Sequence, residues 1–394
     1  MPAKKRLVVC CDGTWNSADL NDNFTNVVRM ARAIKPYDDR SGEQIPQIVY
    51  YHSGVGTGDI LDHTVGGAVG LGLSRNVRDA YAFLAHNYCE GDECFLFGFS
   101  RGAYTVRSVG GLIGHAGLLR KRDMDDFALL WEDYRLMKKP GHVSVLDQFP
   151  ERRTPVRIKG IGVWDTVGAL GIPGHLDDVF RDFFEFHDTN LGAHVDNAFH
   201  ALALDEQRVS FQPTLWQQTP AGQQQNQLLR QVWFAGVHSN VGGGYDEHGL
   251  SDLALAWMAG QVADLLAIDQ DYLRDSQDRR NGWGLGQLYD SGDGPWRVLG
   301  TVPRRPFSPP DQGNRMCESI HRSALERVKP GVACVPAPYT SAALRNAGAN
   351  PPVAEPTPLE QGLVWTAAQI APPAPRTRPE PSFLNRVLRI FGGG

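Results

Sequence analysis

Short continuous runs of apolar residues recur along the N-terminal two thirds of the chain, and most are followed by apolar residues at helical spacing. The runs at 6–11, 47–51, 94–99, 158–164 and 232–237 have the length of strands buried on both faces. Between or after them, residues 26–31, 74–88, 101–113 and 253–266 repeat apolar side chains every three or four positions, as helices do. This alternation predicts an α/β fold, a mostly parallel sheet with helices on both faces.

Two stretches interrupt the alternation, at about 118–155 and 170–195, and we interpret both as insertions over the C-terminal edge of the sheet. The second contains phenylalanines at 180, 183, 184 and 186, which fit plain core packing or a lid or acyl-binding role equally. Glycines and prolines punctuate residues 282–338, where one helix is expected at 318–328. We therefore expect one domain over residues 1–340.

The remaining residues, 341–394, are expected to form a proline-rich tail. The tail ends in a short basic amphipathic segment at 383–391. Such a segment either docks on its own domain or contacts a membrane surface or a partner.

Charge and cysteine content narrow the class of protein. The chain has 39 Lys+Arg against 44 Asp+Glu, a net charge of −5, which argues against a nucleic-acid partner. The chain has no run of about 18 apolar residues, and its first residues do not have the pattern of a signal peptide, so we expect neither a membrane span nor a signal peptide. The six cysteines form no C-x-x-C motif and are expected to be reduced core thiols. We expect a cytoplasmic protein.

A G-x-S-x-G motif at 98–102 lies where an apolar strand pattern meets a helix pattern. This is the position of a nucleophile elbow, in which a strained serine sits between strand and helix. The flanking glycines let the two elements approach closely, and the helix N-terminus favours a developing anion. We expect Ser100 to be a catalytic nucleophile, and the alternative is a buried turn serine.

A serine nucleophile needs a general base and an orienting acid. His238 follows the run at 232–237 and precedes a segment, 239–245, that is too glycine-rich to predict a helix. Asp165 follows the run at 158–164, so the chain order is Ser, Asp, His, as in α/β-hydrolases. Asp205 is the rival acid, and its alternative role is a carboxylate at the end of a helix.

An oxyanion hole is expected to use the backbone N–H of Arg101, the residue after the nucleophile. The loop after the first strand offers a second donor through Gly13 or Thr14. The alternative for this loop is that Asp12 simply caps the turn.

No cofactor or metal is expected. Asp12-Gly13-Thr14 resembles the start of aspartate-nucleophile phosphatases, but position 10, which would carry their nucleophile, is a cysteine. The glycine-rich segments at 54–58 and 66–72 complete neither a dinucleotide-binding nor a phosphate-binding motif. The histidines at 187, 194 and 200 do not have the spacing of a metal site.

Five ordered blocks together resemble one known family: CDGTWN (11–16), YHSGVGT (51–57), FGFSRGA (97–103), GVWDTVG (162–168) and GVHSNVGGGY (236–245). They are similar to the α/β-hydrolase family numbered 2235 among bacterial domains of unknown function (DUF2235). That family includes the catalytic domain of a class of type VI secretion lipase effectors. The resemblance covers roughly residues 5–265, and Asn240 stands where the family pattern has aspartate.

The resemblance implies phospholipase A activity, with Ser100, Asp165 and His238 as the triad. We therefore expect a serine hydrolase of lipid esters, of the phospholipase or lipase type, working through an acyl-enzyme. A small-ester carboxylesterase and a non-catalytic scaffold of the same fold are the alternatives. The expected partner is a lipid or other ester, with peripheral membrane contact through the lid or the C-terminal segment. Export by a type VI system without a signal peptide is the alternative to a cytoplasmic location.

Overall fold

Nine strands form one sheet in the part of the chain that the computed structural model describes, which is residues 4–13, 23–54, 68–167, 189–292 and 300–364. The order across the sheet is β11-β10-β9-β7-β5-β4-β1-β3-β2, and every neighbouring pair is parallel except β2 and β3. The strands are β1 (Arg6–Cys11), β2 (Tyr37–Asp38), β3 (Ile45–His52), β4 (Glu93–Phe99), β5 (Ile158–Trp164), β7 (Asn197–Ala203), β9 (Leu228–Phe234), β10 (Glu318–His321) and β11 (Val353–Ala354). A separate pair joins β6 (Asn190–Leu191) to β8 (Gln217–Gln218). The fold is the predicted α/β-hydrolase-like arrangement.

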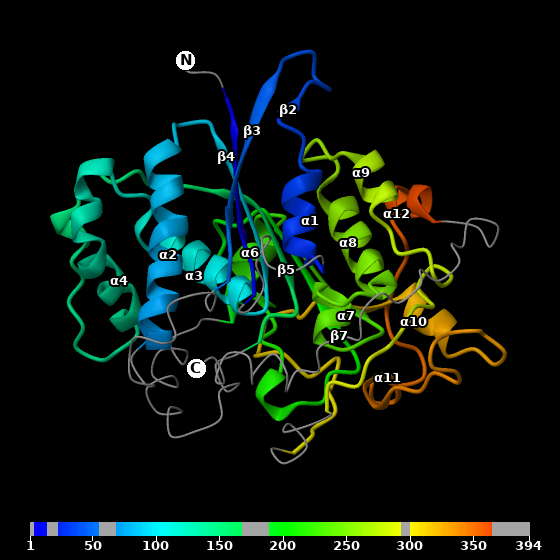
Figure 1. The fold of residues 1–394 in the computed structure, drawn as a ribbon. Helices are drawn as coiled ribbons and strands as arrows, with labels where there is room; N and C mark the ends of the chain where they lie inside the picture. The colour runs from blue at the N-terminus through cyan, green and yellow to red at the C-terminus, as the bar shows by residue number, and fades with distance from the viewer. Residues whose placement is uncertain (1–3, 14–22, 55–67, 168–188, 293–299, 365–394) are drawn as a thin grey trace, which may run out of the picture.

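Helices cover both faces of this sheet (Figure 1). On one face lie α2 (Ala68–Asn87) and α3 (Arg101–Ala116), and on the other lie α1 (Asn26–Ala33) and α8 (Gly249–Val262). The other described α-helices are α4 (Phe127–Leu136), α6 (Pro220–Gln224), α7 (His238–Gly242), α9 (Gln270–Asp275), α10 (Arg322–Arg327), α11 (Ala342–Asn346) and α12 (Pro358–Leu363). Within the described residues, every helix is too short or too polar to cross a bilayer.

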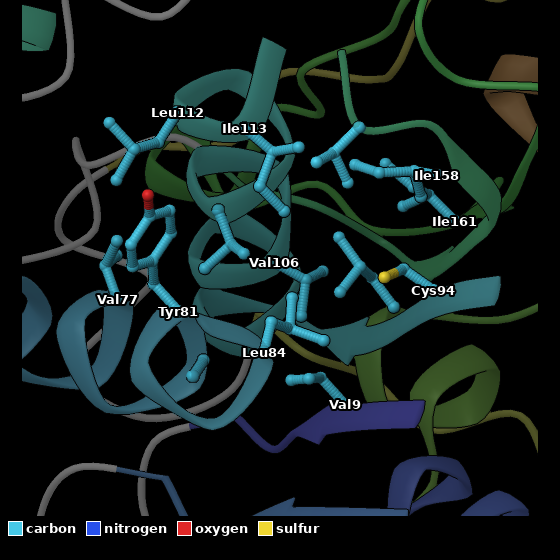
Figure 2. Close-up of a cluster of buried hydrophobic side chains, with 14 of the residues drawn as sticks. Val9, Val77, Tyr81, Leu84, Cys94, Val106, Leu112, Ile113, Ile158 and Ile161 are labelled. Atoms are coloured by element: carbon cyan, nitrogen blue, oxygen red, sulfur yellow. The ribbon is translucent and has the colours of Figure 1, made fainter. Parts of the chain in front are cut away.

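Two cores lie on opposite faces of the sheet, which explains why the strand segments are apolar without alternation. Figure 2 shows the first core, where Val106 of α3 faces Val9, Cys94 and Ile158 of three neighbouring strands. The second core packs α8, in which almost every residue is buried, against apolar side chains of the central strands. The strand ends that carry polar residues are therefore held on rigid, fully packed elements.

Three elements differ from the sequence-based prediction. Residues 318–328 form strand β10 followed by helix α10, because the first four residues pair between β9 and β11. Strand β7 was not predicted, since its alanine-rich segment lacks the β-branched residues typical of strands. The segment after His238 begins with a one-turn helix, α7, and its glycines 243 and 244, with positive φ, end that helix.

The insertion at 118–155 packs on the outside of the α2 and α3 layer rather than over the C-terminal edge of the sheet (Figure 1). It contains two 3₁₀ turns, Lys121–Asp126 and Leu146–Gln148, on either side of α4. Phe127, Leu130 and Trp131 of α4 join the first core. Burying these side chains is what places α4 against the helical layer. Of the second insertion, 170–195, only residues 189–195 are described, so its four phenylalanines lie outside the described residues.

The first part of the expected tail is continuous with the domain. Strand β11 pairs with β10 at the edge of the sheet, and α12 packs against α8. Leu359 and Leu363 of α12 are buried in the second core, and Glu360 bonds Nε2 of His321 at 3.0 Å. The chain segment 341–364 thus completes one edge of the domain. Residues 365–394, including the amphipathic segment, lie outside the described residues.

Candidate active site

Ser100 occupies a strained turn between β4 and α3. Its φ of 57° and ψ of −120° lie in a region that residues with a side chain rarely adopt. The backbone N–H of Ser100 donates to the carbonyl of Trp164 at 3.1 Å, which ties the turn to the end of β5. The serine is therefore held at the carboxyl edge of the sheet, directly before the helix N-terminus.

The two glycines of the motif allow the close approach that this turn needs. A Cβ on Gly98 would lie 2.5 Å from the carbonyl oxygen of Gly102. A Cβ on Gly102 would lie 2.1 Å from the carbonyl oxygen of Cys11 at the end of β1. Both distances are far below van der Waals contact, so no side chain fits at either position without moving backbone.

Asp165 and His238 meet at the same edge. Asp165 directly follows β5 and has a φ of 41°, and His238 is the first residue of α7, beyond the end of β9. Oδ2 of Asp165 lies 2.6 Å from Nδ1 of His238, and both side chains are buried. With Nδ1 donating this hydrogen bond, Nε2 is left as the basic nitrogen of the ring.

Two aromatic rings flank the imidazole of His238. The ring of Phe99, the residue before Ser100, lies 4.6 Å away between centroids, and the ring of Phe211 lies 5.0 Å away. These contacts place the imidazole near the turn that holds Ser100, although no hydrogen bond between the Ser100 hydroxyl and His238 is present in the described structure. Such bonds are often long without substrate and tighten in the reacting complex.

A buried arginine holds the other side of Asp165. Nη1 and Nη2 of Arg304 donate to the two carboxylate oxygens of Asp165 at 2.5 and 2.9 Å. The same guanidinium donates to the carbonyls of Ala203 and Phe211, and Oδ1 of Asp165 also accepts from the N–H of Ala203 at 3.0 Å. Sequence reasoning missed Arg304, because it lies in an irregular proline-flanked segment and no local pattern links it to Asp165.

The electrostatics follow from these contacts. Burial raises the pKa of Asp165, but the Arg304 guanidinium and His238 outweigh burial and hold that pKa well below its usual range. Burial lowers the pKa of His238, and the hydrogen bond to Asp165 opposes this only in part. The imidazole is therefore neutral, and able to accept a proton, at neutral pH.

Asp205, the rival acid, does not contact the imidazole. Its Oδ2 accepts from the backbone N–H of Gly236 at 2.7 Å and from the hydroxyl of Tyr339 at 2.8 Å. Its own N–H donates to the carbonyl of Gly236 at 2.9 Å. Asp205 follows strand β7, not a helix, and it fixes the backbone two residues before His238.

A second residue missed by sequence reasoning, Glu206, supports the start of α7. It is fully buried, and its Oε2 accepts from the N–H of His238 at 3.3 Å and from Arg208 at 2.8 Å. Burial raises the pKa of Glu206, and the hydrogen bond from Arg208 reverses this, so the pKa lies below its usual value. His238 is thus anchored through its backbone as well as through its ring.

The backbone N–H groups expected to form an oxyanion hole differ in their existing hydrogen bonds. Arg101 is the first residue of α3, where backbone N–H groups have no partner within the helix. The N–H of Gly13 already donates to Oδ1 of Asp12 at 2.7 Å. Oδ2 of Asp12 accepts from Thr25 and Tyr51, and burial raises the Asp12 pKa to about 6. Thr14 lies outside the described residues.

The histidines considered as metal ligands have other partners. Nε2 of His200 accepts from the N–H of Thr166, and Nε2 of His194 contacts the carbonyl of Gly110 at 2.8 Å. His187 lies outside the described residues. Across the described part of the chain, no group of three or more His, Cys, Asp or Glu side chains could hold a metal ion.

A comparison with known families matches the part of the chain that contains the five sequence blocks. The model of a family described as the catalytic domain of Tle1-like phospholipase effectors of type VI secretion matches residues 5–261. The uncharacterized protein YEL023C of Saccharomyces cerevisiae is 26% identical over 231 residues, which are 52% of this chain and 32% of that protein. The chain thus spans about a third of the length of this curated relative.

Two solved structures are also similar. An uncharacterized protein from Pseudomonas aeruginosa has 18% identity and a TM-score of 0.39, over 66% of this chain and 45% of that one. Acyl-protein thioesterase 2 of Zea mays has 10% identity and a TM-score of 0.25, over 66% of this chain and 94% of that one.

Proposed function

Because the chain belongs to the family of Tle1-like phospholipase effector catalytic domains, we propose that it hydrolyses carboxylic esters of lipids with Ser100 as nucleophile, His238 as base and Asp165 as acid. The observation that carries the proposal is the 2.6 Å contact between Asp165 and Nδ1 of His238 at the sheet edge that holds the strained Ser100. The lipid substrate follows from the family and not from a bound ligand.

In the proposed mechanism, the Ser100 hydroxyl attacks the ester carbonyl while Nε2 of His238 takes its proton. The tetrahedral oxyanion receives the N–H of Arg101 at the start of α3, where the helix dipole also favours negative charge. Collapse of the intermediate breaks the ester bond, and His238 returns the proton to the leaving alcohol. Water then attacks the acyl-enzyme by the same route and releases the carboxylic acid.

The carboxylate of Asp165 holds the imidazole in the tautomer with the proton on Nδ1 and stabilises the imidazolium that forms in each step. Arg304 keeps that carboxylate ionised and fixes its orientation through two parallel hydrogen bonds. In this proposal Arg304 is a positioning residue, since it touches neither substrate nor reacting atoms.

Labelling with a fluorophosphonate probe tests the nucleophile directly. We expect the wild-type protein to be labelled and Ser100→Ala to lose the label, with kcat on mixed phospholipids falling about 10⁴- to 10⁶-fold. Ser239→Ala, which removes a serine hydroxyl beside His238, is the matched control and should keep the label. Labelling of Ser100→Ala at the wild-type rate would contradict the mechanism.

Product analysis on the same samples separates the candidate functions. Fatty-acid release from phospholipids that depends on Ser100 supports a lipase of the phospholipase type. Turnover of short p-nitrophenyl esters alone would indicate a carboxylesterase. A folded protein with neither label nor turnover would indicate a scaffold that keeps only the fold.

A further inference from the structure

His238 lies on a helix that is too short to be stable by itself. Helix α7 is five residues long, and isolated helices of this length do not persist in water. The position of the imidazole therefore depends on the contacts that hold α7 to its neighbours. Asp205 and Glu206 bond the backbone before and at His238. A buried side chain of α7 itself, Asn240, contacts a different part of the chain.

Asn240 is 1% exposed, and both polar atoms of its side chain have partners. Oδ1 accepts from the N–H of Val237 at 3.2 Å and from the N–H of Tyr289 at 3.2 Å. Nδ2 donates to the carbonyl of Gln287 at 3.0 Å. One amide group thus joins the turn that leads into α7 to a segment 47 to 49 positions further along the chain.

This segment, 287–289, is fixed to the body of the domain. Gln287 forms a parallel bridge with Val335, and the N–H of Leu288 donates to the carbonyl of Val335 at 2.8 Å. The side chain of Leu288 packs against an apolar cluster built on β9 and β10. Asn240 therefore connects α7 to a packed part of the fold, whose position the sheet determines.

The backbone before His238 fits closely against Asn240. Gly236 has a φ of 121°, and a Cβ at this glycine would lie 2.4 Å from Cβ of Asn240. The side chain of Asn240 thus occupies the space that a side chain at 236 would need, and the turn closes directly on the amide. A buried polar group that is hydrogen-bonded in this way makes the structure around it rigid and favours a single arrangement.

We propose that Asn240 is a positioning residue for His238, because its Oδ1 holds the turn before the imidazole against segment 287–289 and so keeps the ring in reach of Ser100. The effect on catalysis rests on the proposed function, whereas the position of the ring beside Asp165 can be followed without substrate. A displacement of about 1 Å at a catalytic group can lower the rate about 100-fold. Loss of the contact should therefore lower kcat and leave KM nearly unchanged.

Two substitutions of Asn240 test the acceptor oxygen. Asn240→Leu keeps a branched side chain and removes the oxygen, so we expect the rate of fluorophosphonate labelling and kcat to fall about 10- to 100-fold, with KM within about threefold. Asn240→Asp keeps an oxygen for the N–H groups of Val237 and Tyr289 and should stay within about tenfold of wild type. Labelling of Asn240→Leu at the wild-type rate would overturn the proposal, and so would equal losses in both variants.

Gln47→Leu is the matched control. Gln47 is 5% exposed, and its amide accepts from the N–H of Ala267 at 2.9 Å and donates to the carbonyl of Lys35 at 2.7 Å. It pairs with Arg6 at the start of β1, at the opposite end of the sheet from the elbow. We expect Gln47→Leu to lower the thermal midpoint at least as much as Asn240→Leu does, with labelling near the wild-type rate. An equal labelling loss in Gln47→Leu would overturn the proposal, because destabilisation alone would then explain the effect.

The hydrogen bond between Asp165 and Nδ1 of His238 provides a readout that needs no substrate. Its proton should give a low-field resonance in the proton NMR spectrum that is absent from His238→Ala. We expect Asn240→Leu to shift or broaden this resonance and Gln47→Leu to leave it unchanged. An unchanged resonance in Asn240→Leu would overturn the positioning role. A wild-type protein that shows the resonance but takes no label would instead refute the proposed function, and the NMR comparison would still decide the role of Asn240.

Hydrogen exchange of the wild-type protein covers the case in which Asn240→Leu does not fold. The N–H groups of Val237 and Tyr289 both donate to Oδ1 of Asn240. We expect each of these amides to exchange at least about 100-fold more slowly than in an unstructured peptide. Rapid exchange at either amide would overturn the proposal, because the contact would then not hold the turn.

Discussion

Two aspartates, the buried Asp165 and the partly buried Asp205, follow neighbouring strands of the sheet, and their surroundings give them different properties. Asp165, after β5, faces the guanidinium of Arg304 and the imidazole of His238, and its pKa is held low against burial. Asp205, after β7, accepts from neutral donors, the hydroxyl of Ser341, the N–H of Gly236 and the hydroxyl of Tyr339. The nearby guanidinium of Arg327 lowers the pKa of Asp205 less than any of these hydrogen bonds does. Burial raises the pKa of Asp205, and its hydrogen bonds offset this only in part. The presence of a directly bonded cation thus decides whether the pKa of a carboxylate at a strand end is lowered or raised.

The two aspartates also contact different parts of the His238 segment. Asp165 contacts the ring of His238, so in the proposed mechanism it affects the tautomer and the charge that forms during proton transfer. Asp205 forms two hydrogen bonds with the backbone of Gly236, which has a φ of 121°, and so holds the segment that leads into α7. The contact of Asp165 therefore affects the protonation of the imidazole, whereas that of Asp205 affects where the backbone before His238 lies.

Exchanging each carboxylate for an amide gives the largest expected contrast. We expect Asp165→Asn to lower kcat by about 10⁴-fold, because the amide no longer fixes the basic tautomer or stabilises the imidazolium. Asp205→Asn keeps an oxygen to accept from Gly236 and should lower kcat by less than about tenfold. Steady-state kinetics on the same ester substrate measures both. The reverse order of effects would assign the acid to Asp205.

Removing the cation from Asp165 should move the pH dependence of activity. In Arg304→Met the Asp165 carboxylate acts on His238 alone, so we expect the acid limb of kcat/KM to move upward by about one pH unit. The loss of orientation should lower kcat about 10- to 100-fold. Arg304→Lys keeps the charge but loses the paired donors, so its shift should be smaller. Profiles from pH 5 to 9 measure this, and equal losses at every pH in both variants would contradict a positioning role.

Stability should depend on pH in opposite directions for the two aspartates. The folded-state pKa of Asp165 is lowered, so its pairing stabilises the fold above the unfolded value of about 4 and this is lost as the pH falls. The folded-state pKa of Asp205 is raised, so its contribution is complete below about pH 4 and declines as the pH rises. Urea unfolding at pH 3, 4.5 and 7.5 should therefore show the penalty of Asp165→Asn growing by about 1 kcal/mol from pH 3 to 4.5, and that of Asp205→Asn shrinking from pH 4.5 to 7.5. Parallel changes in the two variants would contradict the assignment of charge states.

The sequence predicts the strand-end positions of Ser100, Asp165 and His238 because each follows a run of apolar residues that packs in the sheet. It does not predict Arg304, since the contact with Asp165 joins residues 139 positions apart and the arginine lies in an irregular segment. The helix-end alternative for Asp205 was wrong, because this residue follows strand β7. The strand could not be predicted, since its sequence has no β-branched residues and no alternation of apolar and polar positions. Local patterns identify groups that carry chemistry, whereas the partners that set their pKa values depend on long-range packing.

Tyr339→Phe gives the smallest expected effect and isolates the partner of Asp205. The variant removes one hydroxyl donor from Oδ2 of Asp205 and leaves the hydrogen bond from Gly236 in place. We expect the free energy of unfolding to fall by about 1 kcal/mol, the usual cost of one buried hydrogen bond. Activity should stay within about threefold of wild type, since neither the ring of His238 nor Asp165 loses a contact. A loss of activity as large as that of Asp165→Asn would mean that Asp205 acts on the imidazole as well as on the backbone.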